Sequence, residues 1–276
     1  MQLPDNIDID HPERYVLTIR ITSDTFAFCI YEPHLELDYY YSEMSFVVNG
    51  EGENNIQQIV LDSEFLSLPY AEVNVIFVSK DYDLVPNYII KKDKKELLYN
   101  FTHHLPAKQI LYCPDSIQQV STVYNTDQPV YTFLARNLYN PQFYHHSNLL
   151  MQYLEERNKE MGNISKMYLN FHPGFVDIFC YNPSSLILHA ITLQNQTERN
   201  LAYFLLSIWD KCKFDQTKDY LFILNDPQNV NIYSISVLSE YIRYIGHVNI
   251  VNELAIVNKS ETWRGLPLDL LILASK

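Results

Sequence analysis

The sequence predicts an α/β protein with a duplicated chain, giving two lobes that each contain a mixed sheet and flanking helices. Two observations lead to this fold class. The same order of elements occurs twice: three strands, an amphipathic helix and an apolar strand. In addition, residues 28–33 (FCIYEP) resemble residues 179–183 (FCYNP), and their tyrosines and prolines are 150 residues apart. We expect a first lobe at 1–160 and a second lobe at 161–276.

The composition is that of an acidic globular protein. The 276 residues include 20 Lys and Arg against 33 Asp and Glu, a net charge of −13, and 47% of residues are hydrophobic. Disordered chains contain far less apolar sequence. Nucleic acids and anionic membranes attract clustered Lys and Arg, so the negative charge argues against both as partners. Only 6 residues are glycine, and loops that wrap phosphates need backbone without Cβ.

The elements of the first half follow from hydrophobic periodicity. Alternating, β-branched residues at 15–21 predict a strand that ends at the turn Thr22-Ser23-Asp24. Residues 72–79 (EVNVIFVS) are almost wholly apolar, as in a buried central strand. The other expected elements are strands at 26–31, 35–48, 109–113 and 130–134, and helices at 55–66, at 91–100 and after residue 115.

The second half repeats this order after a linking helix. Residues 145–160 carry the apolar stripe of an amphipathic helix, and Gly162-Asn163 is a boundary turn. A further helix begins at Thr197 and has apolar residues on one face. Strands are expected at 166–171, 176–181, 186–193 and 220–224, with a turn at 172–174 and a last helix through Ile245 that Gly246 would cap.

This duplicated unit is the pattern of the actin and hexokinase group, in which each lobe is ribonuclease H-like. The chain resembles a family of uncharacterised bacterial proteins with the actin-like ATPase fold, and is distantly similar to pilus-assembly ATPase-like proteins. The segment Leu84-Val-Pro86, after the apolar strand and before the charged helix, strengthens the similarity. The resemblance covers essentially the whole chain. It implies that ATP and Mg²⁺ bind in a cleft between the two halves.

The first family motif is an Asp-x-Gly turn, whose glycine lets backbone amides approach the phosphates and whose aspartate positions Mg²⁺. In the first half, Arg20 stands at the aspartate position and Thr22 at the glycine position. The hydroxyls of Thr22 and Ser23 remain, and Asp24 comes four residues late. Arg20 could instead hold a phosphate or carboxylate, with Thr22 and Ser23 as donors. We favour a structural role, in which this arginine is a cross-strand salt-bridge partner or a solvated residue.

The other motifs depart from the family pattern as well. In the second half, Asn170 replaces the aspartate and His172 the glycine, and Pro173 removes an amide donor. Gly174 beside that proline is typical of an ordinary hairpin turn. The third motif, a glycine pair after an apolar strand, is replaced by Asn225-Asp226-Pro227. We therefore expect no catalytic residue, no metal and no cofactor at these degenerate positions. A working ATPase or kinase-like enzyme with divergent phosphate loops is the alternative.

Histidine and cysteine give no further chemical signature. H-E-x-x-H, G-x-S-x-G and the P-loop motif are absent. The pairs His103-His104 and His145-His146 are expected to be surface or capping residues, and a contact surface is the alternative for the second pair. The four cysteines lie in or beside apolar stretches and form no C-x-x-C pair, so we expect free buried thiols. With no secretory signal and no apolar run of about 18 residues, we expect a cytoplasmic protein without a membrane span.

Tyrosine is unusually common, with 22 residues. In a strand, Tyr39 and Tyr41 would share one face while Tyr40 lies on the other, and exposed tyrosine is a frequent interface residue. Rings packed with their hydroxyls at the water boundary are an equally good interpretation. The leading hypothesis is a non-catalytic actin-like protein that acts through contacts with a protein partner. The sequence leaves the identity of that partner and the biological role open.

Overall fold

The computed structural model describes residues 7–33, 39–46, 52–90, 94–103, 109–194, 197–224, 232–254, 263 and 265–276. The chain forms two compact units: Met1–Leu149 with Leu254–Lys276, and Leu150–Glu253. This division differs from the expected one at 160/161. It falls inside helix α4 (His146–Glu160), and the C-terminal segment belongs to the first unit.

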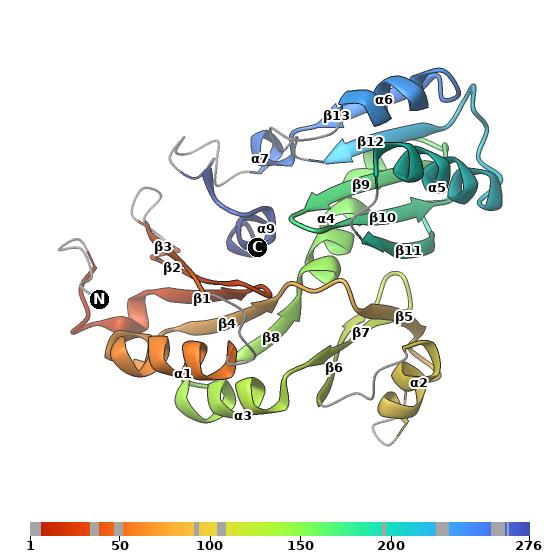
Figure 1. Cartoon of the computed structure of the whole chain (residues 1–276). Helices are drawn as coiled ribbons and strands as arrows, with labels where there is room; N and C mark the ends of the chain where they lie inside the picture. Colours follow the sequence, from red (N-terminus) through yellow and green to blue (C-terminus); the bar gives the residue numbers. More distant parts are fainter. Residues whose placement is uncertain are drawn as a thin grey trace. The chain divides into compact units, whose positions relative to one another are not determined.

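The first unit is built on a five-stranded sheet in the order β3-β2-β1-β4-β8 (Figure 1). The central strand β1 pairs antiparallel with β2 and parallel with β4, and β8 continues the parallel side. The bounds are β1 Val16–Ile21, β2 Thr25–Tyr31, β3 Tyr39–Ser45, β4 Glu72–Phe77 and β8 Gln142–His145. Helices α1 (Gly52–Asp62) and α3 (Gln128–Asn137) cover one face, and the C-terminal helix α9 (Leu268–Ala274) lies on the other. Short 3₁₀ turns at Pro12–Arg14 and Glu64–Ser67 complete the described elements of this layer.

Between β4 and β8 the chain inserts a small antiparallel sheet in the order β5-β7-β6, with helix α2 packed on it (Figure 1). The bounds are β5 Tyr82–Pro86, α2 Lys95–Thr102, β6 Gln109–Asp115 and β7 Val120–Thr126. Its core is small and consists of Tyr99, Ile110 and Val123.

Two expectations in this region were wrong. The stretch after residue 115 is a turn followed by β7, because the run VSTVYNT is rich in β-branched residues. Residues 130–134 lie in α3 instead of a strand. Val130 and Leu134 are buried four residues apart, and Pro129 occupies the first turn, where a helix tolerates proline.

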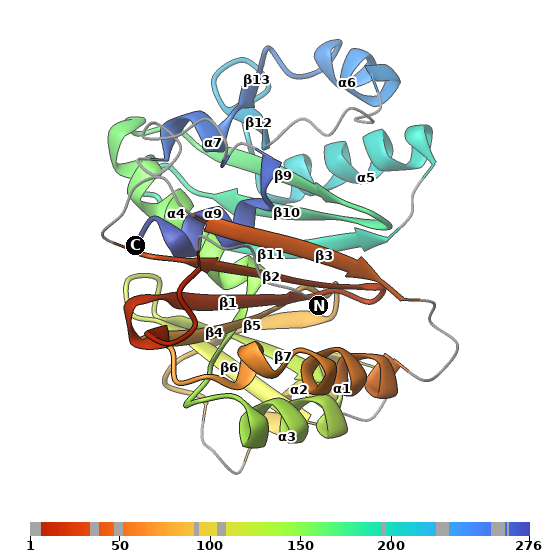
Figure 2. The same ribbon diagram turned by 90° about the vertical axis from the view of Figure 1, so that its left-hand side faces the viewer.

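The second unit has the same sheet topology, β11-β10-β9-β12-β13, with the same strand directions (Figure 2). The bounds are β9 Lys166–His172, β10 Phe175–Tyr181, β11 Ile187–Gln194, α5 Glu198–Lys211, β12 Tyr220–Leu224, α6 Ile232–Ser239, β13 Tyr244–Val248 and α7 Ile250–Glu253. The first strands of the two sheets begin 150 residues apart, at Val16 and Lys166, and so do the second strands, at Thr25 and Phe175. The duplication predicted from the sequence is confirmed by this register.

The last expected helix of the second unit was wrong at its C-terminal end. Gly246 does not cap a helix but lies in β13, directly opposite Phe222 of β12. A Cβ at residue 246 would lie 3.3 Å from the Phe222 ring, a contact so tight that the ring would have to shift. No helix among the described residues is long and apolar enough to cross a membrane.

Candidate functional site

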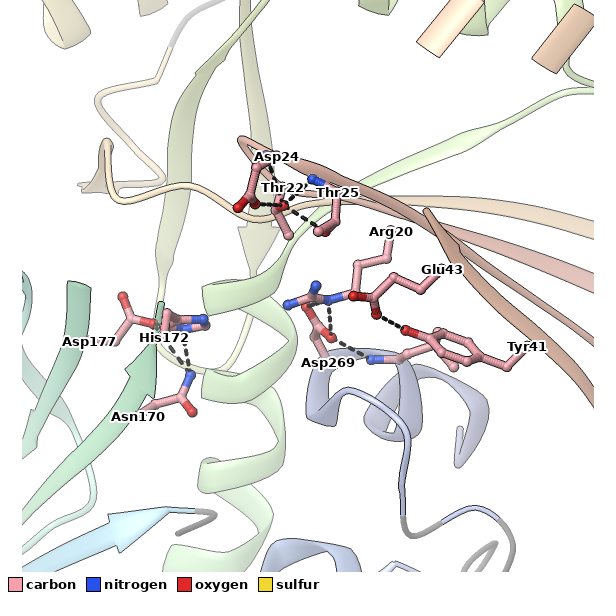
Figure 3. Close-up of polar contacts among 11 residues, drawn as sticks. Arg20, Thr22, Asp24, Thr25, Tyr41, Glu43, Asn170, His172, Asp177 and Asp269 are labelled. Carbon is pink, nitrogen blue, oxygen red and sulfur yellow. Dashed lines mark hydrogen bonds and ion pairs between the residues drawn. The ribbon is translucent and has the colours of Figure 1, made fainter. Parts of the chain in front are cut away.

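The turn between β1 and β2 contains Thr22, Ser23 and Asp24, and the side chain of Thr22 closes it (Figure 3). The Thr22 hydroxyl accepts hydrogen bonds from the backbone amides of Asp24 (3.2 Å) and Thr25 (2.9 Å). It also donates to the Asp24 carboxylate at 2.9 Å and lies 2.7 Å from the Thr25 hydroxyl. Ser23 is exposed. Two amides of the turn where the resemblance places a phosphate are thus bonded to the protein itself.

Arg20, at the position of the family aspartate, forms an ion pair with Asp269 of α9 (Figure 3). Its Nε donates to both carboxylate oxygens at 2.9 Å. The two side chains are only 14% and 8% exposed. The salt-bridge interpretation of Arg20 is correct, although the partner is a helix residue 249 positions later and not a neighbouring strand.

The sheet face that carries Arg20 also carries part of the tyrosine cluster of β3. Tyr39 packs against Trp263 with ring centroids 4.4 Å apart, and Tyr41 donates a hydrogen bond to Glu43. Tyr40 points to the opposite face and packs edge-on against Phe28 at 5.7 Å. The predicted alternation is confirmed. All three rings are half-buried, which matches packed rings with hydroxyls at the boundary better than a fully exposed tyrosine surface.

The corresponding turn of the second unit joins β9 to β10 through Pro173 and Gly174. Gly174 has a φ of +93°, which the third position of a type II turn requires and which proline at the second position favours. This confirms the ordinary hairpin interpretation of Gly174. Pro173 has no amide hydrogen, so its backbone nitrogen cannot donate a hydrogen bond to a phosphate.

The polar groups beside this second turn bond to one another (Figure 3). Asn170 stands directly opposite Asp177 in the β9–β10 pair. The Nε2 of His172 lies 2.7 Å from the Asp177 carboxylate, and the Asn170 amide nitrogen lies 2.8 Å from that Nε2 and 3.4 Å from the same carboxylate. Asp177 is fully buried, and the His172 ring stacks on Phe175 at 4.3 Å. The Asp177 carboxylate is therefore in contact with the side chains of His172 and Asn170 inside the protein.

The sequence reasoning missed the acids that complete both arrangements. Asp269 is the one acidic residue in an otherwise apolar helix, LDLLILA. A single carboxylate among apolar residues was the signal in the sequence, because buried acids usually have a partner. Asp177 is the one charged residue in the otherwise apolar strand β10, FVDIFCY, which is the same signal of a buried acid with a partner. The third predicted position, Asn225-Asp226, lies outside the described residues.

The histidine pairs have different environments. His103 is the C-cap residue of α2, and its Nε2 lies 3.0 Å from the Asp83 carboxylate, so the capping interpretation is confirmed for this residue. His145 and His146 are buried, contrary to expectation. The Nε2 of His145 lies 3.2 Å from the Ser79 hydroxyl and its Nδ1 lies 2.7 Å from the Ser147 hydroxyl, so both ring nitrogens have a partner. His104 lies outside the described residues.

Comparison with known proteins identifies the family and the fold. The chain belongs to the family described as "Protein of unknown function (DUF3822)", whose model matches residues 4–245. It is similar to the crystal structure of a Bacteroides thetaiotaomicron protein with an actin-like ATPase fold and unknown function, with 23% sequence identity and a TM-score of 0.82 over 98% of this chain and 99% of that one.

A second similar structure is a PilM–PilN type IV pilus biogenesis complex. Here the identity is 10% and the TM-score 0.57, over 96% of this chain and 98% of that one. No curated protein matches the sequence. The chain thus has the actin-like ATPase fold that the duplicated pattern predicted.

Proposed function

We propose that this protein is a non-catalytic member of the actin-like fold, which binds no ATP·Mg²⁺ at its inherited turns and acts through contacts with a protein partner. One observation carries the proposal. In each unit, the groups at the positions of the family motifs are bonded to other groups of the protein. The alternative, an ATPase or kinase-like enzyme with divergent loops, would require these bonds to break when the nucleotide enters.

The first turn is chemically unsuited to a triphosphate. A phosphate at this turn would compete with the Thr22 hydroxyl for the amides of Asp24 and Thr25. It would also meet the Asp24 carboxylate, a like charge that raises the cost of approach. The nearby cation, Arg20, already has a carboxylate partner in Asp269, so it offers less positive potential to a ligand than an unpaired arginine would.

The second turn lacks the groups that would hold Mg²⁺. Magnesium prefers carboxylate and phosphate oxygens together with several waters. The position of the family aspartate holds the Asn170 amide, and the nearby carboxylate of Asp177 has no exposed surface and bonds to His172. Mg²⁺ would have to compete with the imidazole of His172 for a carboxylate that has no exposed surface.

Two observations support a role in protein contacts. The similar pilus structure is a complex of two proteins. In this chain, α2 exposes two apolar residues one helical turn apart, Leu97 (70% exposed) and Phe101 (91% exposed), and Tyr88 in the preceding loop is 83% exposed. Large apolar side chains presented in this way are typical of surfaces that meet another protein.

Ligand-dependent stability tests the absence of nucleotide binding. A ligand at 100 times its Kd stabilises the folded state by about 2.7 kcal/mol, which raises Tm by about 5 °C or more for a chain of this size. We expect millimolar ATP·Mg²⁺ to shift Tm by no more than about 1 °C and to be hydrolysed no faster than in buffer. A clear shift with turnover would establish the enzyme alternative. A shift with phosphate or malonate that Arg20→Ala abolishes would instead show a small-anion site.

Affinity capture tests the partner contact. Wild-type protein is compared with a Leu97→Ser/Phe101→Ser variant, and a Leu61→Ser variant provides the control because Leu61 is similarly exposed (60%) on α1. A partner retained by wild type and by the control, but lost with the α2 variant, supports the proposal. Identical capture by all three proteins would exclude α2 as the contact surface.

A further inference from the structure

Two of the four cysteines meet inside the second unit. Cys180 of β10 is fully buried in the core cluster formed by the sheet and α5, and Cys212 packs against the same cluster from the end of α5. The two thiols are close enough that each shifts the pKa of the other. Cys29 and Cys113 lie in the first unit.

The backbone holds Cys212 firmly in this position. It is the C-cap residue of α5, and the following residue, Lys213, has a φ of +57°. The amide of Phe214 donates to the carbonyl of Trp209 (3.1 Å), and the amide of Lys213 donates to that of Asp210 (2.9 Å). These two bonds define a Schellman motif, and the expected hydrophobic contact is present as the Trp209–Phe214 ring pair at 5.2 Å.

Cys180 is held equally well on the strand side. It pairs with Met167 of β9 and with His189 of β11, and the β10–β11 register shifts just after it, between Cys180 and Tyr181. The extra, unpaired residue at this point is Leu188 of β11, so Cys180 itself keeps a partner on both neighbouring strands. Both cysteines therefore lie on backbone that is fixed by hydrogen bonds, Cys180 in the sheet and Cys212 at the capped end of α5.

The two thiols differ in access and acidity. Cys212 is half-buried, so small molecules can reach it, whereas Cys180 has no exposed surface. The hydrogen bond from Cys180 lowers the pKa of the Cys212 thiol, while that bond and burial raise the pKa of Cys180. Cys212 is therefore the attacking thiolate, and Cys180 is the second thiol to react.

We propose that Cys180 and Cys212 form a redox-active dithiol, which small disulfides such as oxidised glutathione convert to an intramolecular disulfide. The Cys212 thiolate attacks a glutathione sulfur, forms a mixed disulfide and releases one glutathione thiolate. Cys180 passes its proton to a departing glutathione thiolate and attacks the Cys212 sulfur, which releases the second glutathione. Two protein thiols are oxidised, and one glutathione disulfide is reduced to two glutathiones.

The test counts thiols in the full-length protein. After incubation with oxidised glutathione, the protein is unfolded, alkylated and weighed, and its peptides are mapped without reduction. We expect the free thiols to fall from four to two, with one cross-linked peptide pair that joins Cys180 to Cys212. A reducing agent should restore all four. The rate should rise with pH as the thiolate fraction increases.

Two variants make the result specific. Cys212→Ser should abolish the cross-link. Because residue 212 is only half-buried, we expect the serine variant to fold, and circular dichroism checks that it does. Cys113→Ser is the matched control. Its hydroxyl keeps the polar contacts of Cys113 with Tyr124 and Phe143, and the cross-link should persist. Four remaining thiols, a stable glutathione adduct on Cys212, or a cross-link to a different cysteine would each overturn the proposal.

Discussion

The ion pair between Arg20 and Asp269 gives the sharpest stability prediction. Asp269→Asn keeps the side-chain shape and removes the negative charge, which leaves the arginine charge in a site where the two side chains are 14% and 8% exposed. Removing one member of a buried pair costs 3–5 kcal/mol in the general case, and because an asparagine oxygen still accepts one hydrogen bond we expect about 2–3 kcal/mol here. This corresponds to a fall in Tm of about 5–10 °C.

The assay is thermal and urea unfolding, and the control is a pair whose arginine is exposed to solvent. Arg14 donates to both carboxylate oxygens of Glu32 at 3.1–3.2 Å, but its side chain is 47% exposed. Glu32→Gln should therefore move Tm by less than about 2 °C. The double variant Arg20→Met/Asp269→Leu should recover most of the loss, because no unpaired charge is left buried. An Asp269→Asn protein as stable as the Glu32→Gln control would refute a structural role for the pair.

Three further predictions concern other points of the fold. Gly246→Ala should lower the free energy of unfolding by about 1–3 kcal/mol because its Cβ would press on the Phe222 ring, whereas Gly265→Ala, which has open space, should stay within about 0.5 kcal/mol in the same urea titration. Burial raises the pKa of Tyr168 to about 12. The unfolded chain loses this proton first, near pH 10, so Tyr168 should lower stability by up to about 3 kcal/mol between about pH 10 and 12, and Tyr168→Phe should remove this part of the decline. Thr22→Val removes the hydroxyl that accepts from two turn amides, and should cost about 1 kcal/mol in chemical unfolding.

The architecture could be predicted from the sequence because hydrophobic periodicity is a local signal and the same order of elements occurs twice. The first, second and fourth strands of the repeated unit were predicted within a few residues in both halves, whereas β5, β7, β8 and β13 were not predicted as strands. The 150-residue displacement between Tyr31 and Tyr181 matches the displacement between the corresponding strands. Residues 130–134 were misassigned because a short apolar run fits a strand and a helix equally well, and only the burial of positions four apart decides between them. Gly246 was misassigned because a glycine after apolar residues resembles a helix cap until its strand partner is known.

The candidate site was predicted only in part. The positions of Arg20, Thr22, Asn170 and His172 followed from aligning each half with the family motif. Their partners could not be found in this way, because Asp269 is 249 residues from Arg20 and no sequence pattern links the two. The hydrogen bonds from the amides of Asp24 and Thr25 to the Thr22 hydroxyl also depend on the rotamer of Thr22, which the sequence does not determine.

The measurement that tests the central claim most directly is an amide NMR titration of the full-length protein with ATP·Mg²⁺. The amides of Asp24, Thr25 and Gly174 report on the two turns that would meet the phosphates. We predict that their resonances stay in place at millimolar nucleotide, as do those of a distant reference such as Gly265. Saturable shifts of the turn amides, with the reference unmoved, would show that nucleotide binds there and would contradict the account.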